Sequence, residues 1–123
     1  MRSISLPHNH GSAIERHIDS IPKTEDFQNL SDVFRLLGDS SRLRIFWILC
    51  HCEECVINIS AMMEMSSPAV SHHLKMLKAS KLIVSRRDGK EVYYQAAHTE
   101  QAELLHQMIE TLLAITCPGS CQT

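Results

Sequence analysis

Apolar residues recur at helical spacing along most of this chain, and polar breaks divide them into short segments. Residues 1–12 are polar and without period, so we expect a flexible arm there. Helices are predicted over 13–20 and over 24–38, where a threonine N-cap precedes two acidic residues. A third helix follows the cap residues at 39–41. It is apolar on nearly every side, which predicts a central buried element.

In the second half of the chain the spacing of apolar residues changes from helical to strand-like and then back to helical. A cysteine-containing segment interrupts the apolar pattern, and a short helix follows it. Ser67-Pro68 then predicts a helix start, with the serine as N-cap, and the helix runs to about Ser80. Residues 82–94 have strand character around a turn at Asp88-Gly89, and a last helix begins near Thr99. The predicted fold is mainly α with a small β-hairpin, a winged helix-turn-helix. We expect an arm over 1–12, one domain over 13–116 and a tail over 117–123.

Composition agrees with a single globular domain. The chain has 123 residues, of which 44% are hydrophobic and 21% charged. The longest strongly apolar run, Ile45–Cys50, is far shorter than the roughly 20 residues of a membrane span. The N-terminus shows no apolar core of a signal peptide. We therefore expect a cytoplasmic protein that does not engage a membrane.

Positive charge is concentrated in one region. Residues 67–92 contain six of the twelve Lys and Arg residues and two acids, which gives this segment a net charge of +4. Because the whole chain has a net charge of −2, the remaining residues together carry −6. Cations gathered on one helix and one hairpin are typical of phosphate contact, although a merely solvated charged face is the plainer interpretation. The candidate DNA-binding residues are Ser67, Ala69, Ser71, His72, Lys75, Arg86, Arg87 and Lys90. His73 adjoins the buried stripe, and we expect it to be packed and hydrogen-bonded.

Three of the five cysteines lie within six residues, at Cys50, Cys52 and Cys55. An odd number of cysteines in a cytosolic chain favours soft-metal or redox chemistry over disulfides. Three thiolates suit arsenite, antimonite, Cd(II), Pb(II) or Zn(II). The cysteines can converge only where the helix ends, because residues two apart on a helix point in nearly opposite directions. Candidate additional ligands are His8 and His10 in the arm and Cys117 and Cys121 in the tail.

Three segments in order resemble the ArsR/SmtB family of metal-sensing bacterial repressors. Residues 34–45 are similar to the family's "ALxDPTRLRIL" segment, residues 66–77 to its recognition helix and residues 83–94 to its wing. The resemblance covers about residues 25–116. It implies a homodimer built on the first and last helices, a two-fold symmetric operator in double-stranded DNA, and release of that DNA when an inducer binds.

The resemblance also suggests where an inducer would bind. Cys55-Val56 matches the start of the family's CVC motif, but Ile57 replaces its second cysteine, so Cys50 and Cys52 would have to substitute. The family's other site lies on the last helix, where one ligand pair would fall at His98 and Glu100 and the other at Thr111 and Ala114. Thr111 and Ala114 cannot bind zinc, and we do not expect that site. His106 and Glu110 are interpreted as a surface pair, although they are spaced i, i+4.

The leading hypothesis is a dimeric DNA-binding repressor that releases its operator when a thiophilic metal or metalloid binds the cysteines. An alternative keeps the fold but makes the cysteines a redox or sulfide sensor. A protein-interaction winged helix that binds no DNA is an alternative of another class. A thiol enzyme is disfavoured because no catalytic base is evident beside Cys52 or Cys55.

Overall fold

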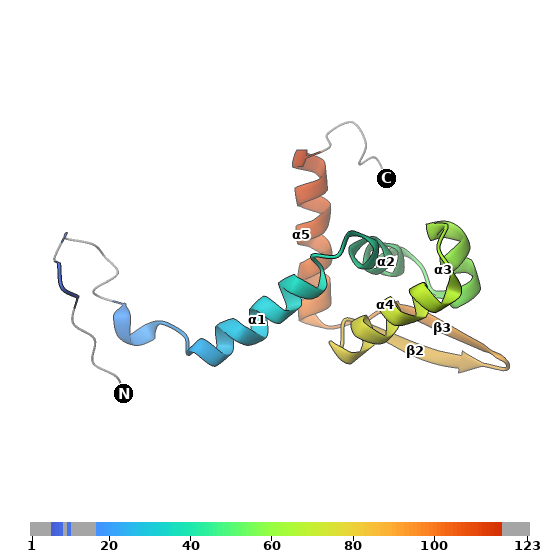
Figure 1. Ribbon diagram of the computed structural model, residues 1–123, viewed down its shortest axis with the longest axis horizontal. Helices are drawn as coiled ribbons and strands as arrows, with labels where there is room; N and C mark the ends of the chain where they lie inside the picture. The colour runs from blue at the N-terminus through green and yellow to red at the C-terminus, as the bar shows by residue number, and fades with distance from the viewer. Residues whose placement is uncertain (1–5, 9, 11–16, 117–123) are drawn as a thin grey trace. The chain divides into compact units, whose positions relative to one another are not determined.

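The computed structural model describes residues 6–8, 10 and 17–116. Residues up to Asp32 and residues from Val33 onward form two compact units, and each is described by itself. The elements, labelled in Figure 1, are η2 (Ile18–Ser20), α1 (Thr24–Leu36), α2 (Ser40–His51), β1 (Glu54–Cys55), α3 (Val56–Met63), α4 (Ser67–Ala79), β2 (Ile83–Asp88), β3 (Glu91–Ala96) and α5 (Glu100–Thr116). The predicted order of helices, hairpin and final helix is confirmed. Of the helix expected over 13–20, residues 13–16 lie outside the described ranges, and among the rest only Ile18–Ser20 is helical, as the 3-10 turn η2.

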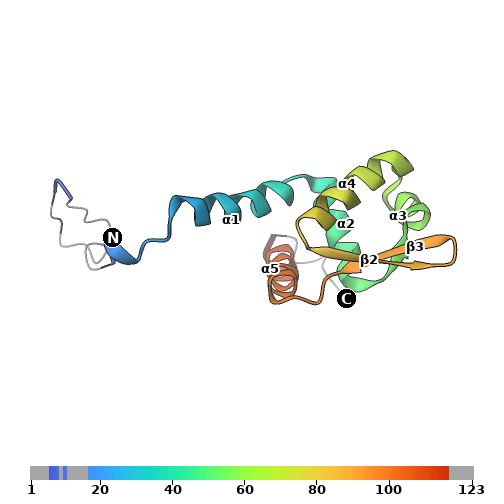
Figure 2. The same cartoon turned by 90° about the horizontal axis from the view of Figure 1, so that it is seen from below.

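Helix α2 is the centre of the second unit, as its apolar sequence predicts. Its residues Ile45, Phe46, Ile48 and Leu49 are buried, and α2 contacts α3, α4, β3 and α5. The inward stripe of α4 completes this core with Val70, Leu74 and Leu77. The hairpin lies along α4, and its tip projects away from the body at the end remote from α5 (Figures 1 and 2).

Side-chain caps fix where the helices start. Asp39 accepts a hydrogen bond from the backbone N–H of Arg42, which confirms the cap predicted for α2. Ser66, not Ser67, caps α4 by accepting from Ala69 N–H. The prediction was wrong by one residue because both serines precede Pro68 and either hydroxyl fits the pattern. Thr24 is likewise the first residue of α1 rather than its cap.

The turn between α3 and α4 forces an unusual backbone conformation on Glu64. This residue ends α3 with φ of 53°, in the left-handed region that non-glycine residues seldom adopt. Backbone N–H groups of Glu64 and Met65 bond back to the carbonyls of Ala61 and Ser60. These bonds close the helix sharply and so set the direction in which α4 leaves.

The hairpin belongs to a three-stranded antiparallel sheet with order β1-β3-β2. Asp88 pairs with Glu91, so the loop is Gly89-Lys90, with Gly89 at φ of 64°. The sequence analysis did not predict β1, in which Glu54 pairs with Tyr94 and Cys55 with Tyr93. The cysteine segment is therefore hydrogen-bonded directly to the wing.

Helix α5 buries one face and exposes another. Ala102, Leu105 and Ile109 are buried. On an adjacent face the side chains of four large apolar residues are exposed, at Leu104, Met108, Leu112 and Ile115. Within the described ranges, no helix has the length and apolar character needed to cross a membrane.

Candidate nucleic-acid interface and metal-ligand cluster

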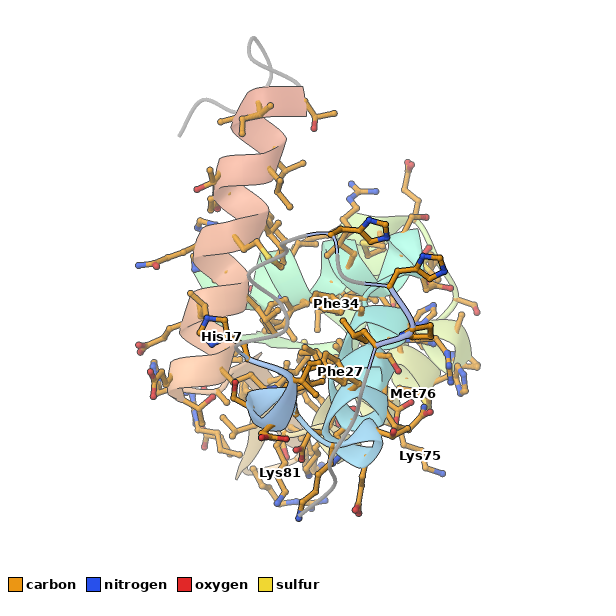
Figure 3. The ribbon with its side chains drawn as sticks, turned by 90° about the vertical axis from the view of Figure 1, so that its left-hand side faces the viewer. His17, Phe27, Phe34, Lys75, Met76 and Lys81 are labelled. Carbon is orange, nitrogen blue, oxygen red and sulfur yellow. The ribbon has the colours of Figure 1, made fainter. Side chains whose placement is uncertain are left out.

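Helix α4 presents polar side chains on the face opposite its buried stripe. Ser67, Ser71, His72 and Lys75 are exposed, and Ala69 is partly exposed. Lys75 extends outward from α4, and Lys81 extends outward from the turn after it (Figure 3). Hydroxyl, imidazole and ammonium groups of this kind can reach base edges and phosphates in a major groove.

The wing carries cations in two different states. Arg87 and Lys90 are exposed near the hairpin tip. Arg86 instead forms a two-bond ion pair with Glu53, with Nε–Oε2 and Nη2–Oε1 distances of 2.8 and 2.6 Å, and it lies 4.8 Å from the Tyr93 ring centroid. The hydrogen bonds from Arg86 lower the pKa of Glu53, so the pair stays charged at neutral pH. Arg86 thus joins the wing to the cysteine segment, a role that the sequence analysis did not foresee.

His73 departs from its expected environment. It is partly buried beside the core, as predicted, and that burial lowers its pKa. Its Nδ1 atom is buried without a hydrogen-bond partner among the described residues, so the expectation of a hydrogen-bonded histidine was wrong. A neutral ring tolerates this position better than a charged one, because an imidazolium would leave a buried donor unsatisfied.

The three clustered cysteines stand on different backbone elements. Cys50 is in the last turn of α2, Cys52 is the residue that caps it, and Cys55 lies in β1. All three are free thiols. Within the described residues they do not form a group whose potential ligand atoms all lie within 4.8 Å of one another. A single ion would have to draw them together.

Burial affects the chemistry of these thiols. It raises the pKa of Cys50 to about 12, with a smaller contribution from the nearby Glu110 carboxylate. Burial and then Glu54 also raise the pKa of Cys52. Both groups are therefore protonated thiols at neutral pH, and a metal ion must displace their protons.

The other candidate ligands fall elsewhere. His8 and His10 are exposed residues of the first unit, with ring centroids 5.6 Å apart. Cys117 and Cys121 lie outside the described residues. The possible contribution of these four residues to a metal site stays a prediction.

A different cluster has the spacing of metal ligands. His51 at the end of α2 meets His106 and Glu110 of α5, and potential ligand atoms of the three all lie within 4.8 Å of one another. Glu110 Oε1 lies 2.8 Å from His51 Nε2 and 3.1 Å from His106 Nε2, and the two nitrogens are 3.2 Å apart. Trp47 Nε1–H donates to the same oxygen at 2.9 Å.

These contacts lower the pKa of Glu110. Its hydrogen bond with His51 is the largest influence lowering its pKa, followed by those with His106 and Trp47. Of this three-residue cluster, only the i, i+4 pair of His106 and Glu110 could be recognised in the sequence. His51 could not be linked to that pair because 55 residues separate it from His106.

A pocket of about 210 Å³ adjoins the cluster. Its walls come from the end of α2, the end of β3 and the start of α5. The residues with potential metal-binding atoms that line it are Cys50, His51, Cys52, Glu53, His98, Glu103 and His106. Solvent and small ions therefore have access to the histidines from the side on which the cysteines lie.

Comparison with known sequences gives a consistent group of relatives. The profile of the family described as "Bacterial regulatory protein, arsR family" matches residues 39–85. A transcriptional repressor SmtB homolog from Synechocystis is 36% identical over 69% of this chain and 64% of its own length. An arsenical resistance operon repressor from Staphylococcus aureus is 34% identical over 70% of this chain and 79% of its own length. Both are named as repressors and neither as an enzyme.

Solved structures share the fold. A homodimeric winged helix-turn-helix DNA-binding domain from Mycobacterium bovis, described as a possible ArsR-family transcriptional regulator, superposes with a TM-score of 0.68 at 25% identity, over 77% of this chain and 87% of that one. Reduced HlyU from Vibrio cholerae superposes with a TM-score of 0.64 at 27% identity, over 76% and 94%. The winged helix-turn-helix architecture predicted from the sequence is confirmed.

Proposed function

The chain belongs to the arsR family of bacterial regulatory proteins, and we propose that it is a homodimeric repressor that releases operator DNA when a thiophilic metal or metalloid binds its cysteine segment. It would act in the cytoplasm, where the DNA is. The observation that carries the proposal is the set of exposed cations on α4 and the wing, where α4 lies within the family match over residues 39–85 and the wing cations directly follow it.

The geometry of α4 and the wing supports DNA binding. The polar face of α4 is exposed and can enter a major groove. Arg87 and Lys90 at the hairpin would contact the adjacent backbone. Each phosphate that is neutralised releases counterions, so binding should weaken steeply as salt increases.

The exposed apolar face of α5 supports a dimer. Leu104, Met108, Leu112 and Ile115 are between 37% and 70% exposed in the single chain. A row of this size is costly to leave in water, and a second copy of α5 would cover it. Two recognition helices related by a two-fold axis would then read two half-sites of one operator.

The cysteine segment is placed to transmit inducer binding. Drawing Cys50, Cys52 and Cys55 onto one ion would shift the segment that contains Glu53, because the three thiols do not lie within metal-ligand distance of one another among the described residues. Glu53 holds Arg86 of the wing, and β1 is paired with β3. Metal binding would therefore shift the wing relative to α4 and lower the affinity for DNA by a coupling free energy.

The raised pKa values of Cys50 and Cys52 are unlike those of redox-sensing cysteines, although a metal ion would also have to compete with their protons. Redox-sensing cysteines react as thiolates and are found where their pKa is lowered. A metal ion, in contrast, can displace a thiol proton by direct coordination. Arsenite, antimonite, Cd(II), Pb(II) and Zn(II) remain candidate inducers because all accept thiolate ligands.

Binding of the reduced, metal-free protein to duplex fragments of its own genome tests the proposed interface. After an operator is selected, Lys75→Ala and Arg87→Ala should each weaken binding by about tenfold and reduce its salt dependence by about one counterion. Lys23→Ala, which removes one cation that is not among the proposed DNA-binding residues, is the control and should bind like the unaltered protein. If none of the fragments binds in a salt-dependent way, the protein-interaction alternative replaces this proposal.

A further inference from the structure

We propose that His51, His106 and Glu110 form a Zn(II) site within one subunit, which clamps the end of α2 to α5. This site is distinct from the proposed cysteine site and goes beyond the proposed function, since it requires neither DNA nor thiolates. Two imidazoles and one carboxylate are typical zinc ligands and leave a fourth position for water or another ligand.

The distances fit an ion of this size. Zinc bonds to nitrogen and oxygen at about 2.0–2.1 Å, so a tetrahedral centre holds its ligand atoms about 3.3 Å apart. His51 Nε2, His106 Nε2 and Glu110 Oε1 are already separated by 2.8, 3.1 and 3.2 Å. Movements of a few tenths of an ångström would admit the ion, whereas the three cysteines do not form such a group among the described residues.

Protons satisfy this cluster less well than a cation would. Two ring nitrogens and the Trp47 N–H all converge on a single carboxylate oxygen. If both rings carried a proton at Nε2, two N–H groups would also face each other across 3.2 Å. One cation in the centre gives both nitrogens and the oxygen a common partner.

The surroundings hold the ligands in place. Trp47 donates to Glu110, and its ring lies against His51 with centroids 4.3 Å apart. His51 and His106 meet edge to face at 4.9 Å. Partners of this kind orient metal ligands and commonly alter metal affinity by about 10–100-fold. The side chains of the three ligands are between 29% and 36% exposed, so an ion can reach them.

The site is also compatible with dimerisation. His106 follows Leu104 by two residues and Glu110 follows Met108 by two residues, which places each ligand about 200° around the helix from that apolar residue. The ligands therefore project from the side of α5 opposite its exposed apolar face. A zinc ion here would brace α2, which leads into the cysteine segment, against the helix proposed to form the dimer.

Titration with Co(II), a spectroscopic substitute for Zn(II), separates this site from the cysteines. In a full-length variant with all five cysteines changed to Ser, we expect one Co(II) per chain, with absorption of a four-coordinate ion and no thiolate charge-transfer band. Zn(II) should displace the bound Co(II).

His106→Gln and Glu110→Gln should weaken Co(II) binding at least about 100-fold, and Trp47→Phe about 10–100-fold with the same spectrum. His98→Gln, which changes a histidine of the same pocket outside the cluster, is the matched control and should bind as the parent does.

Native mass spectrometry of the unaltered chain provides a second measurement if the cysteine-free variant does not fold. His51→Gln or His106→Gln should then bind one fewer Zn(II) per chain than the unaltered protein or His98→Gln. Equal zinc content in all these proteins would overturn the proposal, as would a Co(II) spectrum that depends only on the cysteines. Both results are independent of DNA binding, so failure of the zinc site can be distinguished from failure of the proposed repressor function.

Discussion

Single polar side chains determine where the helices around the proposed DNA-binding surface begin. Asp39 accepts from Arg42 N–H at the start of α2, and the Arg42 guanidinium in turn donates to the carbonyl of Leu36 at the end of α1. These bonds fix the junction between two helices. The sequence placed the α2 cap among residues 39–41, and the structure shows that Asp39 is the one that caps. The sequence analysis misplaced the α4 cap because Ser66 and Ser67 are chemically equivalent until the backbone is known.

The cap at Asp39 predicts a pH dependence. The hydrogen bond from Arg42 N–H lowers the pKa of Asp39 from its usual value of 3.8, so the folded protein binds this proton less readily than the unfolded chain. The resulting stabilisation is present above pH 3.8 and is lost as the pH falls through the lowered pKa. Asp39→Asn retains a capping side chain without its charge.

Thermal unfolding between pH 7 and pH 2 measures this effect. The unaltered protein should melt at a higher temperature than Asp39→Asn above about pH 5, and the difference should vanish toward pH 2. Asp19→Asn, at an exposed position in the first unit, is the control for the loss of one acidic group. A constant difference across the whole range would show that the charge of the cap does not matter.

At the scale of elements, the important unexpected feature is the small strand β1. Two residues contain too little pattern to predict a strand, and their partners in β3 lie about 40 residues further along the chain. The helices and the hairpin were predictable because each is encoded locally, by apolar period, caps and the Asp88-Gly89 turn. Pairing of the cysteine segment with the wing is a tertiary property, and so is the ion pair between Glu53 and Arg86.

The ion pair gives an element-scale prediction. Glu53→Gln removes the charge that holds Arg86, so movement of the cysteine segment should reach the wing less effectively. In the unaltered protein we expect metal to lower DNA affinity by about 10–100-fold, a typical coupling. In Glu53→Gln this ratio should fall at least about threefold, while metal still binds. Fluorescence anisotropy of labelled operator with and without Cd(II) measures the ratio.

Glu100→Gln, an exposed acid in the first turn of α5, is the control for removing one negative charge. Its ratio should equal that of the unaltered protein. If Glu53→Gln also keeps the full ratio, the Glu53–Arg86 contact does not carry the coupling, and β1 pairing alone would have to do so.

At the scale of the whole molecule, the features that suggest regulation join segments distant in sequence. His51 meets His106 and Glu110 only because α2 packs against α5. The apolar face of α5 points away from that contact and would bind a second chain. Local patterns predicted the basic helix and wing, but not the histidine cluster, because only His106 and Glu110 share a local pattern and His51 lies 55 residues from His106.

Cd(II)-dependent release of operator DNA tests the central claim most directly. Reduced, metal-free protein bound to its operator should lose affinity at least about tenfold when one Cd(II) is added per chain. Cys52→Ser and Cys55→Ser variants should bind the operator equally well but remain bound in Cd(II), and a chelator should restore binding of the unaltered protein. Release that is unaffected by these two substitutions, or complete insensitivity of the unaltered complex to Cd(II), Pb(II) and arsenite, would contradict the account.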